Sequence, residues 1–547
     1  MKASDLFLRC LEAQGVTHIY GVPGEENADL MISLLNSSIE FVICRHEQAA
    51  SFMADMHGRL TGKPGVCLAT LGPGATNLMT GVANANMDHV PLIAIIGQAD
   101  TTRLHKVSHQ NMDSVSMYEP VTKWATTVRN AEVIPEVVCK AVKTATIGVP
   151  GAVLIELPED VAKEETDAQP INLLRTEFES GVSDEQIQET LALIKASKKP
   201  ILLVGDGAVA AEADKEIRAL MDKTNMYGAT TFMGKGAIDA RHKHSLRCVG
   251  LGMKDIAVKA YDEADLVITI GYNMVEWPPS RWNEKADKKI IHIARSAAEV
   301  DACYIPRIEL IGEINEIVCA INKGLTKDHE KDPQLFAKIR EEVENDIDLH
   351  EDDDSFPIKP QRILADVRKA LRDDDILVSD VGAHKMWVAR QYPTYQSKTC
   401  FIYNGFCSMG GSMAGATQAK WIHPDKNAVA IVGDGGFIMS IQALVTAVQY
   451  KAPITVLVWE DHFYGLIKWK QEAAYHKMSH VELKNPDLVA LAKSFGCHSE
   501  KLESTDQLLP ALKASFEKKD KPTVLVVPVD YSENMKLTEH LGKILSH

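Results

Sequence analysis

The chain contains 547 residues, of which 45% are apolar and 24% charged, and its formal net charge is −16. This length accommodates about three ordinary domains, each with its own core, and the composition is that of a globular protein rather than a disordered one. The negative charge disfavours nonspecific binding to nucleic acid or to an anionic membrane surface. Small molecules are therefore the expected partners, with no nucleic acid and no membrane.

Two further features bear on location and redox chemistry. Met1–Cys10 contains Asp5 and lacks the charged leader and long apolar core of an export signal. No run of about twenty uninterrupted apolar residues could span a membrane, so a cytoplasmic protein is expected. The ten cysteines are scattered without a CxxC pair, which argues against a zinc site and a disulfide framework.

Predicted strands and helices alternate along the chain. The pattern begins with a capped amphipathic helix from Ser4 to near Gly15, a strand through Ile19 and Tyr20, and a strand at Phe41–Cys44. A helix is expected from Glu47 to Gly62. Further strands are expected at Val66–Leu71, Pro91–Gly97, Ile201–Val204, Leu266–Ile270, Ile290–Ile293, Ile376–Val378, Val429–Val432, Ile454–Trp459 and Thr523–Val527. Such alternation predicts parallel sheets covered by helices on both faces.

Two polar stretches divide this pattern into three parts. Glu164–Asp184 is a candidate linker, and the charged segment Lys327–Asp354 marks a second boundary. We therefore predict an α/β fold with three doubly wound parallel-sheet domains at residues 1–170, 185–345 and 356–535.

Two carboxylates of the third domain follow predicted strands. Asp434 lies in the sequence GDGG (433–436) directly after one strand, and Asp461 follows the next. The carboxyl ends of parallel strands meet at one sheet edge, where ligands bind, and two acids there need a cation to offset their repulsion. Mg²⁺ accepts one or two carboxylates plus phosphate oxygens, and glycines let backbone N–H groups approach the phosphate. Taken alone, GDGG also fits an ordinary turn.

The sequence argues against one common class of phosphate-binding enzyme. The chain has no GxxxxGK[ST] loop, which argues against the usual kinase or ATPase site.

In the first domain, RHEQAA (45–50) lies where a strand meets a helix, and GPGATN (72–77) follows another strand. Taken alone, Glu47 also fits a first-turn carboxylate favoured by the helix dipole.

These motifs occur together in an order that resembles the thiamine diphosphate enzymes, and the likeness spans about Ala3 to Met535. It is closest to the catabolic, FAD-independent acetolactate synthases at HQNMD (109–113), PVTK (120–123) and VPVDYS (527–532). The resemblance implies a pyrimidine-binding first domain, a central domain and a diphosphate-binding third domain. One departure is Glu460-Asp461, which stands where the family has NN or ND.

The resemblance also implies roles for individual residues. Mg²⁺ would be bound by Asp434, Asp461 and the backbone carbonyl of Phe463. Glu47 would be catalytic, hydrogen-bonding the aminopyrimidine ring of thiamine diphosphate, and Met409 would wedge that cofactor into a bent shape. Further cofactor contacts are implied for Thr70, Gly72, Pro73, Asn77, Gly382, Ala383, His384, Phe406, Ser408, Gly433, Gly435, Gly436, Tyr464, Gly465 and Leu466. Met409 also fits a core methionine that fills a gap.

Substrate contacts are implied for Gln110, Ile467 and Lys470. Glu25 lies where some decarboxylases of the superfamily carry an acid, and Lys470 replaces the glutamine expected in the catabolic synthases. A surface amide is the alternative for Gln110, and solvated surface charges are the alternative for Glu25 and Lys470.

The implied reaction decarboxylates pyruvate and joins the two-carbon unit to a second pyruvate, which gives 2-acetolactate and CO₂. The family also implies a homodimer or homotetramer with its sites at the subunit interface. FAD is not expected, because Gly271–Glu276 and Trp282-Asn283 resemble the flavin-free branch and Ile291–Arg295 lacks the acidic pattern of flavin-bearing relatives. Two alternatives stay open: a nonoxidative 2-oxo acid decarboxylase that releases aldehydes, and a noncatalytic cofactor-binding protein.

Overall fold

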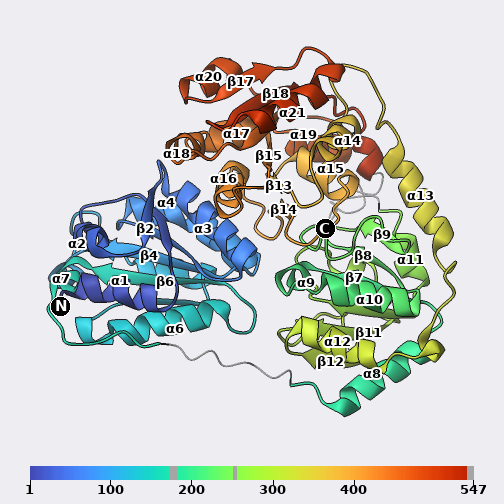
Figure 1. The fold of residues 1–547 in the computed structure, drawn as a ribbon, viewed down its shortest axis with the longest axis horizontal. Helices are drawn as coiled ribbons and strands as arrows, with labels where there is room; N and C mark the ends of the chain where they lie inside the picture. The colour runs from blue at the N-terminus through green and yellow to red at the C-terminus, as the bar shows by residue number, and fades with distance from the viewer. Residues whose placement is uncertain (173–180, 251–254, 539–547) are drawn as a thin grey trace.

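The computed structural model describes residues 1–172, 181–250 and 255–538. Within these ranges the chain forms three six-stranded sheets in which every pair of neighbouring strands is parallel. Figure 1 shows the N-terminal unit in blue, the central unit mainly in green and the C-terminal unit in orange and red, each with helices flanking its sheet. The predicted α/β class with three parallel sheets is confirmed.

The N-terminal unit has the strand order β2-β1-β3-β4-β6-β5. Its strands are β1 (His18–Gly21), β2 (Glu40–Ile43), β3 (Gly65–Ala69), β4 (Leu92–Gln98), β5 (Trp124–Thr127) and β6 (Ala152–Pro158). Its helices are α1 (Ala3–Ala13), α2 (Ala28–Ser33), α3 (Glu47–Thr61), α4 (Pro73–Met87), α5 (Ser114–Tyr118), α6 (Ile134–Thr146) and α7 (Glu159–Lys163), with short 3₁₀ turns η1 (Leu34–Asn36), η2 (Thr101–Arg103), η3 (Glu119–Val121) and η4 (Ala131–Val133). Strands β3, β4 and β6 are buried along their whole lengths, as expected for inner strands covered on both faces.

Helix α1 begins without the capping side chain that was predicted at Ser4. The N-cap residue is Lys2, which makes no side-chain cap hydrogen bond, and Ser4 is buried within the helix. The Ser33 hydroxyl of α2 donates to the Ser4 hydroxyl at 2.8 Å, and the Ala3 amide donates to the Glu164 carbonyl at 2.8 Å. The first amide is thus satisfied by a tertiary contact that local sequence cannot reveal.

The central unit has the strand order β12-β11-β10-β7-β8-β9. Its strands are β7 (Pro200–Val204), β8 (Tyr227–Thr230), β9 (Ser245–Cys248), β10 (Leu266–Ile270), β11 (Lys289–Ala294) and β12 (Ile308–Ile311). Its helices are α8 (Asp184–Ala196), α9 (Asp206–Ala210), α10 (Asp214–Thr224), α11 (Val258–Glu263) and α12 (Ile314–Gly324), with the 3₁₀ turns η5 (Pro279–Arg281) and η6 (Lys327–His329). Helix α13 (Ala337–Asp348) follows and leads to the C-terminal unit.

The C-terminal unit has the strand order β14-β13-β15-β16-β18-β17. Its strands are β13 (Ile376–Ser379), β14 (Cys400–Ile402), β15 (Ala428–Gly433), β16 (Thr455–Glu460), β17 (His498–Lys501) and β18 (Thr523–Pro528). Its helices are α14 (Pro360–Ala370), α15 (Ala383–Gln391), α16 (Ser412–Ile422), α17 (Asp434–Ser440), α18 (Ala443–Gln449), α19 (Gly465–Tyr475), α20 (Leu488–Ser494) and α21 (Leu508–Glu517), with the 3₁₀ turns η7 (Thr505–Gln507) and η8 (Asn534–Thr538).

The N-terminal and C-terminal units share one hydrophobic cluster, in which α3 packs against α16 (Figure 1). Arg59 of α3 forms buried ion pairs with Asp55 at 2.7 Å and with Asp88 at 2.6 Å. Asp88 also accepts a hydrogen bond of 2.7 Å from the Gly405 amide of the C-terminal unit. Loss of one partner from a buried ion pair of this kind costs about 3–5 kcal/mol, so this network fixes the two units against each other.

Two sequence expectations concern the chain as a whole. Seven of the ten cysteines are buried and all ten are free, as expected for small core residues. Among the described residues, no helix is both long and apolar enough to cross a membrane.

Candidate active site

Asp434 and Asp461 lie at the carboxyl ends of two neighbouring strands. Asp434 begins α17 directly after β15, and Asp461 directly follows β16. The two strands pair in parallel, with Gly433 opposite Trp459. The strand pairing therefore brings the two predicted metal ligands to one edge of the sheet, where open α/β sheets bind ligands.

The electrostatics of these acids fit a divalent cation. Burial and the neighbouring Asp434 carboxylate raise the pKa of Asp461 to about 7, and burial raises the pKa of Asp434. Asp434 accepts hydrogen bonds from the Gly435 amide at 2.8 Å, the His462 amide at 2.8 Å and Asn485 Nδ2 at 2.7 Å. These donors orient the carboxylate but bring no full positive charge, so Mg²⁺ would relieve the repulsion between the two acids.

The loop that carries the third predicted ligand is held in place by backbone hydrogen bonds. The Tyr464 amide donates to the Val481 carbonyl at 2.8 Å, and the Leu483 amide donates to the His462 carbonyl at 2.7 Å. Phe463 lies between these two bonds, and its own amide donates to Asp461 Oδ1 at 3.3 Å. The fixed loop keeps Phe463 beside the two acids. Within the described ranges no group of three or more His, Cys, Asp or Glu side chains lies where it could hold a metal.

A cavity of about 460 Å³ opens beside these residues. It is lined by the predicted residues Gly382, Ala383, His384, Met409, Gly433, Asp434, Gly435, Gly436, Asp461, Phe463, Tyr464, Gly465, Leu466, Ile467 and Lys470. Phe406 and Ser408 do not line it, and the Phe406 side chain is exposed. A Cβ atom at Gly465 would lie 2.8 Å from Asp461 Oδ2, so a side chain there would crowd this acid. A Cβ atom at Gly435 would lie 2.9 Å from the Tyr464 ring and would press on that ring.

His384 supplies a buried polar atom that fits an absent ligand. Burial lowers the pKa of His384 to about 3, so the imidazole is neutral at pH 7. Its Nε2 atom is buried and has no hydrogen-bond partner. Because buried polar atoms are nearly always hydrogen-bonded, a ligand atom in the cavity would be the partner of this nitrogen. The acid pair and the glycines together fit a diphosphate bound through Mg²⁺.

Glu460, the departure from the family pattern, makes a contact away from the proposed metal ligands. Its carboxylate is buried and forms an ion pair with Lys501 of β17, the edge strand of the same sheet. The substitution is therefore compensated by a structural salt bridge, while Asp461 keeps the cavity-lining position.

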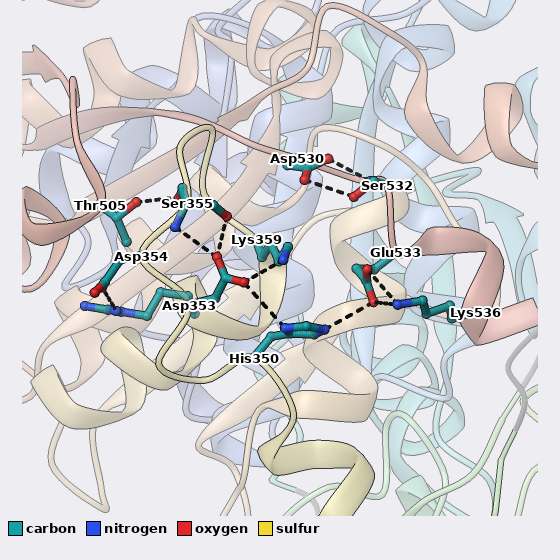
Figure 2. Close-up of polar contacts among 11 residues, drawn as sticks. His350, Asp353, Asp354, Ser355, Lys359, Thr505, Asp530, Ser532, Glu533 and Lys536 are labelled. Atoms are coloured by element: carbon teal, nitrogen blue, oxygen red, sulfur yellow. Dashed lines mark hydrogen bonds and ion pairs between the residues drawn. The ribbon is translucent and has the colours of Figure 1, made fainter.

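Tyr531 also lines the cavity, and the segment that carries it is held from both sides. Trp387 Nε1 of α15 donates to Asn534 Oδ1 at 2.7 Å. Figure 2 shows His350 between Asp353, with Nδ1 and Oδ2 3.4 Å apart, and Glu533, with Nε2 and Oε2 3.6 Å apart. Further polar contacts in this view join Asp353 to Lys359, Glu533 to Lys536 and Asp530 to Ser532. His350 thus places the segment after α13 beside the segment that bears Tyr531.

The N-terminal unit carries a second group of predicted residues, centred on Glu47. Glu47 is the first residue of α3 and is only 9% exposed. Asn77 of α4 donates to Glu47 Oε2 at 3.1 Å, and a Cβ atom at Gly74 would lie 3.5 Å from Oε1. The structure thus brings RHEQAA and GPGATN together, with Glu47 oriented by a neutral amide rather than paired with a cation.

Thr70 joins the first loop of the N-terminal unit to this group. Its hydroxyl donates to Glu26 Oε2 at 2.7 Å, and a Cβ atom at Gly24 would lie 2.4 Å from the Thr70 Cβ. Glu26 is buried, whereas the predicted Glu25 is exposed. The buried acid that contacts Thr70 is therefore Glu26, which was not predicted from the sequence as a site residue.

Gln110 lies beside the start of α4, with an exposed side chain and left-handed backbone at φ 55°. A Cβ atom at Gly72 would lie 2.7 Å from the Gln110 carbonyl oxygen, so glycine at 72 permits this close approach. Pro73 follows as the first residue of α4. Gln110, Gly72 and Pro73 thus join the group around Glu47.

The two groups belong to different units of the chain. All lining residues of the 460 Å³ cavity come from the C-terminal unit, and none from the N-terminal unit. One direct contact links the groups within a single chain: Gln48 Nε2 donates to the Met409 carbonyl at 3.4 Å. Glu47 therefore lies on a helix that contacts the Met409 loop but does not itself line this cavity.

A second cavity of about 570 Å³ lies between the N-terminal and central units. Asp206, Gly271 and Arg295, at the carboxyl ends of β7, β10 and β11, line it together with Arg59 and Asp88. The expectation that FAD is absent rested partly on Gly271–Val275 and Ala294-Arg295. Both segments border this cavity.

Sequence reasoning missed several residues of the site. Lys385, Met386, Cys407, Trp459, Trp469 and Tyr531 also line the 460 Å³ cavity. Asn485 was missed as well, and it donates directly to Asp434. Of these residues, Tyr531 stands in a segment that the sequence analysis singled out, VPVDYS (527–532), but that motif assigned it no role.

Comparisons with known proteins bear on all three units. Residues 1–117 match the family model described as the N-terminal TPP binding domain of thiamine pyrophosphate enzymes, residues 187–321 match the central domain, and residues 380–527 match the C-terminal TPP binding domain. The chain is 34% identical over 553 residues to an acetolactate synthase of Bacillus subtilis (strain 168), covering 100% of this chain and 97% of that protein. It is 32% identical to a catabolic acetolactate synthase of Raoultella terrigena, covering 99% and 98%. It is 30% identical to the acetolactate synthase isozyme 2 large subunit of Escherichia coli (strain K12), covering 98% and 97%.

Proposed function

Because the chain belongs to the thiamine pyrophosphate enzyme family, we propose that it is a Mg²⁺-dependent acetolactate synthase that converts two molecules of pyruvate into 2-acetolactate and CO₂. The observation that carries the proposal is the retention of both chemical groups, Glu47 and the acid pair, in a chain similar over its whole length to acetolactate synthases. We also propose that the protein belongs to the catabolic branch of the acetolactate synthases, on the basis of the motifs around Gln110.

Each group has its own task in this proposal. When bound, thiamine diphosphate supplies the carbon nucleophile and the electron sink that decarboxylation of a 2-oxo acid requires. Asp434, Asp461 and the Phe463 carbonyl would hold Mg²⁺ and, through it, the diphosphate. The glycines of the cavity would give the phosphates room, and the His384 ring lines the same space.

Glu47 would hold the proton that the aminopyrimidine ring exchanges. Asn77 orients its carboxylate with a neutral amide rather than with a cation. Gln110 would contact the substrate from the loop beside Gly72, and Met409 would pack against the cofactor rings. Closure of the site against water lets carbon attack compete with protonation.

We propose a homodimer as the smallest active unit, with Glu47 of one chain completing the cavity of the other. The absence of N-terminal residues from the lining of the 460 Å³ cavity supports this arrangement. The contact between Gln48 and Met409 within one chain favours the alternative, in which both groups act in the same chain. The proposed reaction uses no flavin, and the 570 Å³ cavity takes no part in it.

One second function is favoured by a specific observation. Lys470 lines the cavity with an exposed side chain where the catabolic synthases have glutamine, and a charge there can favour protonation over carbon attack. The chain would then release aldehydes as a nonoxidative 2-oxo acid decarboxylase. A noncatalytic cofactor-binding protein is disfavoured, because such a protein has no use for Glu47.

Release of CO₂ from pyruvate tests whether the chain is catalytic. Protein dialysed against a chelator should release CO₂ only after thiamine diphosphate and Mg²⁺ are added together, and Glu47→Gln should abolish most of this activity. Release that does not depend on the cofactor, or no release at all from cofactor-loaded protein, would refute the proposal.

A further inference from the structure

Lys385 is a buried lysine in the wall of the 460 Å³ cavity. It is the third residue of α15 and is only 5% exposed. No motif of the sequence analysis includes it, and the proposed function assigns it no role. Its position nevertheless places an ammonium group at the cavity that also contains the acid pair.

The partners of Lys385 provide no negative charge. Its Nζ donates to Asn404 Oδ1 at 2.9 Å and to Cys407 Sγ at 3.2 Å. Among the residues that the structure describes, no carboxylate forms an ion pair with Lys385. Asn404 Nδ2 in turn donates to Glu276 Oε1 at 3.2 Å. The first carboxylate that these hydrogen bonds reach from Lys385 is therefore that of Glu276, on the far side of Asn404.

A buried ammonium group without a counter-ion is costly, because burial removes its hydration and only an anion compensates fully. The cavity beside Lys385 offers space for such an anion. Asn404 Oδ1 and Cys407 Sγ leave the charge of Lys385 without an ionic partner among the described residues, and an anionic oxygen in the cavity would supply one.

We propose that Lys385 binds an anionic oxygen group of a ligand in this cavity. This inference rests on the proposed function, which supplies two such groups: the diphosphate of the cofactor and the carboxylate of the 2-oxo acid. The shared chemistry is a charge-assisted hydrogen bond from an ammonium group to an anionic oxygen. Asn404 and Cys407 hold the Lys385 side chain in place for this contact.

A purely structural role is the competing explanation. Cys407 has left-handed backbone at φ 56°, and Lys385 could serve only to fix that loop. Such a role predicts losses of stability that do not depend on the charge of the ligand. Ligands with and without the anionic group therefore separate the two explanations.

The test uses the full chain with Mg²⁺ and measures binding of thiamine diphosphate and of thiamine, which lacks the phosphates, by the fluorescence of cavity-lining tryptophans. Lys385→Met and Lys385→Gln remove the charge, and Lys385→Arg keeps it. The matched control is Lys420→Met, which removes a similarly buried lysine, 7% exposed, whose Nζ donates to the Pro424 and Lys426 carbonyls and which does not line the cavity. The pyruvate KM of each variant is measured in parallel.

If Lys385 contacts the diphosphate, the Met and Gln variants should weaken thiamine diphosphate binding about tenfold, whereas Lys385→Arg and Lys420→Met stay within about threefold. Binding of thiamine should not change. If Lys385 contacts the substrate carboxylate, the same variants should raise the KM for pyruvate about tenfold and leave the affinity for thiamine diphosphate unchanged. Wild-type affinity and KM in both charge-removing variants would overturn the inference.

A measurement on the wild type covers variants that fail to fold. Cys407 Sγ lies 3.2 Å from Lys385 Nζ, so an anion bound there should shield Cys407 from iodoacetamide. Mg²⁺ with inorganic diphosphate, or pyruvate alone, should slow labelling of Cys407 but not of the half-buried Cys303, which does not line this cavity. Unchanged labelling of Cys407 with both anions would overturn the inference. Failure of the wild type to bind thiamine diphosphate would instead refute the proposed function.

Discussion

Asn77 donates a hydrogen bond of 3.1 Å to Glu47, and this bond joins the amino-terminal ends of two packed helices, α4 and α3. The two motifs that contain these residues are separated by a complete strand, β3. The fold thus supplies a buried carboxylate with a neutral partner, which is the arrangement a group needs if it is to exchange a proton rather than form a salt bridge.

Glu47→Gln should slow proton exchange at the reactive carbon of the cofactor and leave binding of thiamine diphosphate within about threefold of the wild type, since general acid–base groups contribute about 10²–10⁴-fold to rate. The substitution keeps the size of the side chain and removes its ability to take a proton. Deuterium exchange followed by acid quench and NMR measures the rate. Normal exchange in this variant would exclude the proposed role of Glu47.

Asp434→Ala and Asp461→Ala should weaken binding of thiamine diphosphate and Mg²⁺, because each removes a charge that holds the cation. Excess Mg²⁺ should restore binding only in part. Asn485→Ala removes only a hydrogen bond to Asp434 and should cost less, about tenfold in metal affinity. Titration with both ligands measures these effects, with the exposed Asp506→Ala as control. Equal affinities in all four variants would rule out the metal site.

Chains carrying Glu47→Gln, mixed with chains carrying Asp434→Ala, should recover activity if each site combines groups from two chains. Random pairing in a twofold-symmetric dimer then leaves one intact site in each mixed dimer, or roughly a quarter of wild-type activity. The measurement is activity after joint unfolding and refolding or coexpression, compared with each variant alone. An inactive mixture with proven mixed dimers would show that both groups act in one chain.

Glu276→Gln should change how stability depends on pH. Burial, together with the neighbouring Asp206, raises the pKa of Glu276 to about 8 in the folded chain. The unfolded carboxyl releases its proton near its ordinary pKa, so the wild type loses stability as pH rises from about 5 to 8, on the order of a few kcal/mol. Glutamine does not titrate. The Tm of the wild type should therefore fall relative to that of Glu276→Gln across this range, and a constant difference would contradict the raised pKa.

The sequence was informative about the sheets and about residues at strand ends. Apolar runs such as Ala428–Val432 are long enough for one buried strand, and the acids after them necessarily reach the same sheet edge. The helix predicted from Glu47 ends before Gly62, whose φ of 68° suits a helix terminus. Functional residues inside helices, or in loops distant along the chain, could not be predicted from such strand patterns.

Lys385, Asn485 and Tyr531 illustrate what local pattern leaves out. Lys385 is buried because its partners, Asn404 and Cys407, come from a loop beyond β14, and sequence spacing says nothing about that approach. Asn485 reaches Asp434 from a segment more than fifty residues away along the chain. Tyr531 lines the cavity from a segment that Trp387 contacts through Asn534. Each contact depends on tertiary packing.

Product distribution depends on a small energy difference at the site. A change of about 1.4 kcal/mol between the barriers for protonation and carbon attack alters the ratio of products tenfold. Lys470 lines the cavity and carries a charge that can deliver a proton or shift the acceptor. Lys470→Gln should therefore raise the ratio of acetolactate to aldehyde, and larger 2-oxo acids should give aldehydes at an appreciable rate with the wild type. A ratio that does not change in Lys470→Gln would show that Lys470 does not influence this competition.

The products that the wild-type protein forms from saturating pyruvate, with thiamine diphosphate and Mg²⁺, test the proposed function most directly. Proton NMR of the reaction distinguishes 2-acetolactate from acetaldehyde without further derivatisation. We predict 2-acetolactate as the main product, accompanied by CO₂. Acetaldehyde as the only organic product would contradict the synthase assignment and establish the decarboxylase alternative in its place.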